Sequence, residues 1–110
     1  MGGEPVTVVL PDEIDIATAP GAGLDLAAAF GAGARVVIAD MTGTTFCDGA
    51  GARMLVVAHR AAFAVGAELR VVTSSPQVRL VLAVTGMDAV LSVYPSLAAA
   101  RAGLPPGMLS

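Results

Sequence analysis

Short apolar segments rich in β-branched residues alternate with segments of helical periodicity along this chain. Such alternation is typical of parallel strands joined by right-handed helical crossovers. We expect strands near residues 6–10, 14–16, 35–40, 68–73 and 90–94, and helices near residues 18–31, 48–66, 74–86 and 95–103. The sequence therefore predicts an α/β fold, with a mixed, largely parallel sheet of about five strands and four helices in the order β-β-α-β-α-β-α-β-α.

The first two predicted strands follow one another with no helix between them. Pro11-Asp12-Glu13 separates them and has the composition of a turn. Ile14-Asp15-Ile16 then alternates apolar and polar residues, as a half-buried strand does. We expect these two strands to form a hairpin that opens the sheet.

Helical phasing and strand alternation indicate which side chains form the core. In the helix near residues 48–66, one face should lie on the sheet, and it carries Met54, Leu55, Ala58, Ala61, Ala62 and Val65. For the whole chain, the residues that we expect to be buried are Val36, Val37, Ile38, Leu55, Ala58, Ala62, Leu69, Val71, Leu80 and Val84.

The chain has 110 residues, which suits one compact domain and is too short for two. We expect a single domain over residues 1–110, with an ordered core of about 4–103 and a loose tail over 104–110. No uncharged apolar run approaches the roughly 18 residues that a membrane span needs. The first residues also lack the basic and apolar regions of a signal peptide. We therefore expect no direct membrane insertion.

Charged and metal-ligating residues are few. The net charge is −3, and the six basic residues are scattered arginines, so we expect no nucleic-acid partner. The single cysteine, Cys47, cannot form an internal disulfide and suits a reducing compartment, so we expect a cytoplasmic protein. One histidine and one cysteine do not make a metal site, and we expect neither a metal nor another cofactor.

The segment TTFCDGAGARML, residues 44–55, contains the turn between an apolar stretch and a helix, where α/β proteins often keep their chemistry. Asp48 is placed to cap the helix, because its carboxylate can accept from backbone N–H groups at the positive helix end. Gly49, Ala50 and Gly51 then make a first turn with almost no side chains. This leaves the start of the helix open to close approach by another molecule.

One flank of the same helix carries Val56, His59, Arg60 and Phe63 at helical spacing. Two interpretations of this flank remain open. Val56 and Phe63 pack against a neighbouring helix, or the flank forms a ridge that faces a partner.

The run from Arg35 to Leu55, the opening LPDEIDIATAP and the closing SSPQVRLVLAVTGMDAVLSVYPSLAAARAGL together resemble the STAS domain. That family includes bacterial anti-sigma factor antagonists and the cytoplasmic domains of sulphate transporters. The resemblance spans nearly the whole chain, and it implies the same order of strands and helices.

In the stand-alone antagonists, the family pattern at this turn is Asp-Ser-Ser/Thr-Gly. The first serine is phosphorylated by the partner, an anti-sigma factor that is also a serine kinase, and the phosphoryl group prevents binding. Asp48 and Gly51 match this pattern, whereas Gly49 stands at the acceptor position and Ala50 beside it. Neither residue has a hydroxyl, so the usual switch cannot operate at position 49. Glu13 and Asp15 match the acidic pair of the family's second strand.

The resemblance implies a protein-interaction module that binds an anti-sigma factor of the serine-kinase type. The residues that it assigns to partner binding are Asp15, Asp48, Gly49, Ala50, Gly51, Arg53 and Val56. One alternative is a STAS subunit of a membrane-associated lipid-transport complex, and another is a weak nucleotide-binding regulatory domain, since helix starts bind anions. Homodimer formation and a surrogate phosphosite at Thr42, Thr44 or Thr45 are left open.

Catalysis has little support in the sequence, and we expect no enzyme activity. His59 lies on a helix flank with no evident nucleophile beside it. Cys47 follows an apolar stretch and should be buried as a small apolar residue. A reactive thiolate at this position would need the nearby helix start to stabilise it, so redox sensitivity stays a minor alternative.

Overall fold

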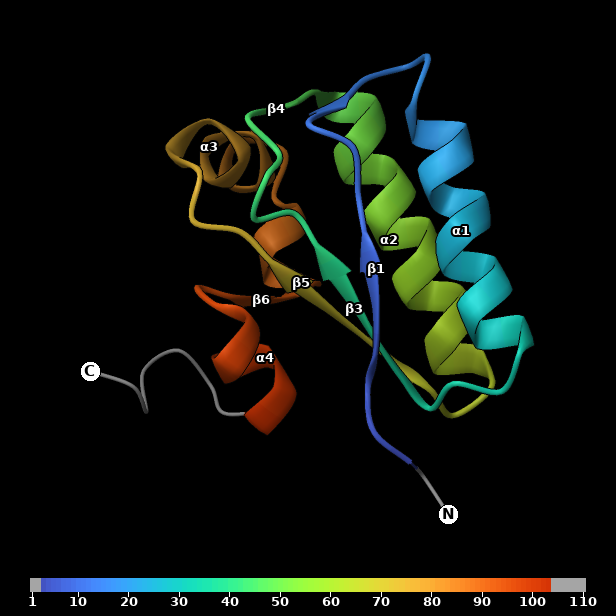
Figure 1. The fold of residues 1–110 in the computed structure, drawn as a ribbon. Coiled ribbons are helices and arrows are strands. Elements are labelled where there is room, and N and C mark those ends of the chain that lie inside the picture. Colours follow the sequence, from blue (N-terminus) through green and yellow to red (C-terminus); the bar gives the residue numbers. More distant parts are fainter. Residues whose placement is uncertain (1–2, 104–110) are drawn as a thin grey trace.

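The structure, a computed structural model, describes residues 3–103. It contains two sheets of parallel strands, and helices cover both faces of the larger one (Figure 1). The larger sheet has the strand order β1-β3-β5-β6, and β2 pairs with β4 in a second, two-stranded sheet. In chain order the elements are β1 (Val6–Val9), β2 (Glu13–Ile14), α1 (Ala19–Gly31), β3 (Val36–Asp40), β4 (Phe46–Cys47), α2 (Gly49–Ala64), β5 (Glu68–Val72), α3 (Pro76–Val84), the 3-10 turn η1 (Met87–Ala89), β6 (Ser92–Tyr94) and α4 (Leu97–Ala102). The predicted α/β class is confirmed, and the elements follow the predicted order with the short strand β4 and the turn η1 added. The tail prediction for residues 104–110 lies outside the described residues.

The predicted hairpin is wrong. The first strand pairs with β3, and β2 pairs in parallel with β4 through Glu13 opposite Phe46 and Ile14 opposite Cys47. The backbone carbonyl of Asp12 accepts from the N–H of Thr45, which ties the turn after β1 to the segment before β4. Alternation identified β2 as a strand, but it carries no information about the partner, and β4 is too short to be recognised by pattern.

The side chains of the larger sheet point alternately to two apolar layers. On one face, Val37, Leu69 and Val71 pack with buried residues of α1, α2 and α3. On the other face, Ile38 and Val72 pack with α4 in a smaller cluster. Figure 1 shows α1 and α2 side by side on one side of the sheet and α4 on the other.

Most of the predicted core is confirmed: Val37, Ile38, Leu55, Ala62, Leu69 and Val71 are buried, and Val36 and Ala58 are half-buried. Leu80 and Val84 are exposed, so their predicted burial is wrong. The third helix turns Val78 and Leu82 toward the core instead. Residues two positions further along a helix point away from that face, because each residue advances the direction by about 100°.

The buried face of α2 is also rotated from the predicted one. Ala52, Leu55, Val56 and Ala62 are buried, whereas Ala61 and Val65 are exposed. Ala61 and Val65 lie on the side of α2 that borders α1, where the two helices leave a groove.

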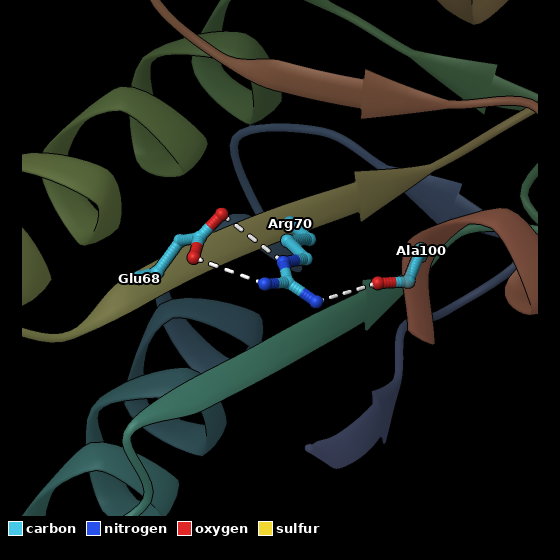
Figure 2. Close-up of polar contacts among 3 residues, drawn as sticks. All are labelled: Glu68, Arg70 and Ala100. Carbon is cyan, nitrogen blue, oxygen red and sulfur yellow. Dashed lines mark hydrogen bonds and ion pairs between the residues drawn. The ribbon is translucent and has the colours of Figure 1, made fainter. Parts of the chain in front are cut away.

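An arginine ties β5 to α4 on the far face of the sheet (Figure 2). The Nε of Arg70 donates to Glu68 Oε2 at 3.0 Å, and its two terminal nitrogens donate to Glu68 Oε1 at 3.1 Å and to the Ala100 carbonyl at 2.8 Å. The hydrogen bond to Glu68 raises the pKa of Arg70 above its ordinary value. The guanidinium thus adds a second donor to a carbonyl in the last turn of α4, which also accepts from the backbone N–H of Gly103 at 3.2 Å.

Candidate functional site

The turn between β4 and α2 is closed by Asp48, as predicted. One carboxylate oxygen of Asp48 accepts from the backbone N–H groups of Ala50 at 2.9 Å and Gly51 at 3.1 Å. The backbone N–H of Asp48 in turn donates to the carbonyl of Ile14 at 3.1 Å, which holds the start of α2 against β2. The helix therefore begins at a position fixed by both its cap and its neighbouring strand.

Gly49 and Gly51 have very different surroundings in this turn. A Cβ added at Gly51 would lie 2.6 Å from the Sγ of Cys47 and 2.9 Å from Cγ2 of Ile14, so only glycine fits there without rearrangement. A Cβ added at Gly49 would meet nothing within 4 Å, and Gly49 is exposed. Packing therefore does not explain why position 49 lacks a side chain.

Asp15 directly follows β2, and its side chain stabilises the turn that comes next. Its carboxylate accepts from the N–H groups of Ala17 and Thr18, while the hydroxyl of Thr18 accepts from the N–H of Asp15. The backbone hydrogen bond from Thr18 is the main reason that the pKa of Asp15 is lowered. Because Asp15 and Asp48 directly follow the paired strands β2 and β4, the structure brings these two predicted site residues to the same edge.

Cys47 is fully buried, as predicted, and its backbone is bracketed by Gln77 of α3. The N–H of Cys47 donates to Oε1 of Gln77 at 2.9 Å, and Nε2 of Gln77 donates to the carbonyl of Cys47 at 2.9 Å. Burial, with a contribution from the charge of Asp48, raises the pKa of Cys47 to about 11. A thiol with this pKa is protonated at neutral pH, which argues against a redox role. Nothing in the sequence singled out Gln77, since its function depends on a contact between distant segments.

The remaining predicted site residues of α2 differ in exposure. Arg53 is exposed, whereas Val56 is 6% exposed and belongs to the core, so its side chain is not available to a partner. Phe63 is 77% exposed and stacks on His59, with ring centroids 6.4 Å apart. Each interpretation of this flank therefore holds for one residue: Val56 packs inside the protein, and Phe63 remains on the surface, where a partner could contact it.

The three threonines before the turn are not equivalent. Thr44 is buried, and its hydroxyl donates to the Pro11 carbonyl at 2.7 Å. Thr42 and Thr45 are exposed, and their hydroxyls donate to Asp40 and to the Asp12 carbonyl. A kinase can therefore reach Thr42 and Thr45 more readily than Thr44.

A groove of about 940 Å³, which the sequence pattern did not predict, extends from this turn along the α1–α2 surface. Gly49, Ala50 and Arg53 line it at the turn, and Phe30 and Val65 lie further along the two helices. Its lining is almost entirely apolar. The signal that could have revealed it is the phasing of α2, in which Ala61 and Val65 lie away from the buried face.

Two structural features bear on the other predictions. Within residues 3–103, no group of three or more His, Cys, Asp or Glu side chains could hold a metal ion. Over the same residues, none of the helices combines the length and the apolar character needed to cross a membrane.

Comparison with known proteins gives one family and several similar folds. The family model described as the STAS domain matches residues 3–100. No curated protein sequence matches the chain significantly.

Solved structures with a similar fold include an anti-sigma factor antagonist from Mycobacterium paratuberculosis, at 23% identity and a TM-score of 0.76, covering 91% of this chain and 85% of that one. The antagonist SpoIIAA in its unphosphorylated form gives 20% identity and a TM-score of 0.72, covering 88% and 84%. The phosphorylated form of SpoIIAA from Bacillus gives 20% identity and a TM-score of 0.65, covering 92% of each chain.

Proposed function

Because this chain belongs to the STAS domain family, we propose that it is an anti-sigma factor antagonist that binds an anti-sigma factor of the serine-kinase type and thereby releases a sigma factor. Structural neighbours described as anti-sigma factor antagonists support this proposal. The proposal assumes a bacterial cytoplasm, in which the lone Cys47 stays reduced. The partner surface that we propose consists of Asp15, Asp48, Gly49, Ala50, Gly51 and Arg53.

The observation that carries the proposal is the environment of Gly49. It is the first residue of α2, it is exposed, and a side chain there would meet no other atom within 4 Å. Position 49 is therefore open to a partner, but it has no hydroxyl for that partner to phosphorylate. We propose that binding is independent of phosphorylation at this turn.

The physical basis of the missing switch is charge. A phosphoryl group on a side chain at position 49 would add a charge of nearly −2 at neutral pH. It would stand next to the carboxylate of Asp48, which already accepts from the N–H groups of Ala50 and Gly51. Such a charge would be repelled by Asp48 and would alter the docking face, and a glycine at position 49 excludes both effects.

The test measures the affinity of the native chain and three variants for a serine-kinase-type anti-sigma factor of the same bacterium, with and without ATP. We expect the native chain to bind equally in both conditions. Gly49→Ser should bind without ATP and weaken with it, since it restores an acceptor. Gly49→Asp should bind about tenfold more weakly or worse, and Gly49→Asn is the control of nearly equal volume without charge.

Phosphate incorporation into the native chain decides the second half of the proposal. We expect none under conditions that phosphorylate Gly49→Ser. Phosphorylation of native Thr42 or Thr45 that weakens binding would mean that the switch has moved, and phospho-independence would be wrong. An absence of any binding by the native chain would contradict the antagonist function itself.

A further inference from the structure

The groove between α1 and α2 has a floor of small residues and a rim of large apolar ones. Gly23 and Ala27 of α1 and Ala58 and Ala61 of α2 are among its lining residues. Lining residues recur at spacings of three and four along both helices, which is the spacing of one helical face. Met54 and Phe30 also line the groove and are half-buried, but along the stretch of small residues the backbone of a third helix can come close, as helix packing at about 8–10 Å requires.

The rim of this groove is too exposed for the surface of a protein that works alone. Ile16 is 80% exposed, Leu24 71%, Val57 60% and Val65 74%. Contiguous apolar surface of this kind marks an interaction site. An acyl chain on the floor would leave these rim side chains in water, whereas a helix is wide enough to cover both sides. Because the exposed rim residues lie on both sides of the groove, we favour a protein helix as the occupant over a small amphiphile.

The charge of the groove indicates a second property of the occupant, an acidic group at one end. Among residues 3–103, Arg53 is the single charged one that lines the groove, and it lies at the end next to Gly49. Within the described residues, the structure gives Arg53 no salt bridge. A carboxylate on the occupant would complement it there.

The groove of a second copy does not supply that carboxylate. If two grooves faced each other with their helices antiparallel, Arg53 would meet the far end of the groove, where the lining residues Phe30, Gly31 and Val65 carry no charge. If the helices ran parallel, Arg53 would face its own copy. In both arrangements the lining of the second groove offers this cation no carboxylate, which favours another protein over a groove-to-groove dimer.

We propose that the α1–α2 groove binds an amphipathic helix of a protein partner, with an acidic residue of that helix against Arg53. Such a helix buries apolar side chains at positions i, i+3, i+4 and i+7. The 16 residues of α2 give a length of about 24 Å, enough for about four turns of the partner helix. This inference rests on the proposed function at one point, because Gly49, Ala50 and Arg53 belong both to the proposed partner surface and to the groove.

The test titrates the full chain, labelled with ¹⁵N, with three synthetic 18-residue peptides followed by NMR. The first peptide has an apolar stripe at helical spacing and a glutamate at each end, the second has lysines at the ends, and the third has the composition of the first with the stripe scrambled. We expect the first peptide to bind saturably and to shift amide signals of α1 and α2. The lysine peptide should bind about fivefold more weakly or worse, and the scrambled peptide should not saturate.

Two variants of the chain locate the site. Ala61→Glu puts a carboxylate on the floor of the groove and should weaken the first peptide about tenfold or more, because binding would bury that charge. Ala83→Glu makes the same change at an exposed position of α3 and should leave the affinity within about twofold. Both positions are exposed in the free chain, so the fold should tolerate both changes, and circular dichroism verifies this.

Three results would overturn the proposal: equal affinity of native and Ala61→Glu chains for the first peptide, equal affinity of the glutamate and lysine peptides, or a native dimer that Ala61→Glu dissociates in sedimentation. The last result would assign the groove to a second copy. The peptide assay contains no anti-sigma factor, so its failure leaves the proposed function standing. Failure of the anti-sigma factor to bind the native chain would likewise leave the groove result unaffected.

Discussion

Gly49 and Gly51 are two positions apart in α2, yet the structure permits a side chain at one and not at the other. The Cβ of an alanine at position 51 would overlap Cys47 and Ile14, whereas position 49 faces open space. The free energy of unfolding should reflect this contrast directly, because both residues lie in the first turn of the same helix.

We predict that Gly51→Ala lowers the free energy of unfolding by about 1–3 kcal/mol, the usual cost of overpacking. Gly49→Ala should leave it unchanged or raise it by up to about 1 kcal/mol, because alanine restricts the unfolded chain. Urea unfolding with unchanged m-values checks both. Cys47→Ala should recover part of the loss in the Gly51→Ala background, and a strictly additive double mutant would contradict the contact with Sγ.

Burial of Cys47 makes a second prediction at this scale, concerning pH. The folded thiol has a pKa of about 11, whereas an unfolded thiol has about 8.5. As the pH rises, the thiol of Cys47 therefore loses its proton at a higher pH in the folded protein than in the unfolded chain. The stability linked to this residue is fully present below pH 8.5 and is lost as the pH rises toward 11.

The measurement is the free energy of unfolding between pH 8 and 11 for the native chain and Cys47→Ala. The native chain should lose more stability over this range than the variant does. A thiol reagent at pH 8 should also react with native protein only at the rate of unfolding. Rapid modification of the folded protein would contradict the burial of Cys47 and would reopen the redox interpretation.

At the scale of elements, β4 is held by a side chain on one side and by β2 on the other. The amide of Gln77 satisfies both the N–H and the carbonyl of Cys47, as a neighbouring strand would. Without it, these two buried backbone groups would have no partner there, at a cost of about 1–3 kcal/mol each.

We predict that Gln77→Met, which keeps the length of the side chain, lowers the free energy of unfolding by about 2–4 kcal/mol. Arg79→Ala is the control, since Arg79 is exposed on the same helix. Urea unfolding gives the free energies, and hydrogen exchange of the Cys47 amide reports the local effect. If that amide exchanged as slowly in Gln77→Met as in the native chain, the two hydrogen bonds between Gln77 and Cys47 would not be needed to protect it.

The long, strongly patterned elements could be predicted from sequence, and the short ones that shape the site could not. Continuous apolar residues identified β3, and the cap of Asp48 was evident from its position before a glycine-rich helix start. The pairing of β2 with β4 and the bracket of Gln77 join segments about 30 residues apart, and local patterns carry no such information. The flank of Val56 was left open between packing and partner contact for a similar reason, because periodicity leaves the rotation of a helix uncertain until its neighbours are placed.

At the scale of the whole molecule, some faces of the helices and strands form the core, and others remain open to solvent. One face of the larger sheet and the three helices α1, α2 and α3 enclose the main core, and α4 closes the other face through Arg70 and a small cluster. The start of α2 and the α1–α2 groove remain uncovered on the first side. Burial thus stabilises the molecule, while the groove that it leaves open has an apolar lining of the kind that suits association.

We therefore predict no turnover of common ester, phosphate-ester or nucleotide substrates by the purified protein. The thiol of Cys47 is protonated and buried just before the start of α2. His59 comes ten residues after that start, which places it about 15 Å further along the helix, and its ring stacks on Phe63. A nucleophile and a base must come within hydrogen-bond distance to act together, and these two residues cannot do so. The measurement compares hydrolysis by the native chain with that by His59→Ala and Cys47→Ala. A rate above background that persisted through purification and disappeared in either variant would show that the protein has a catalytic site after all.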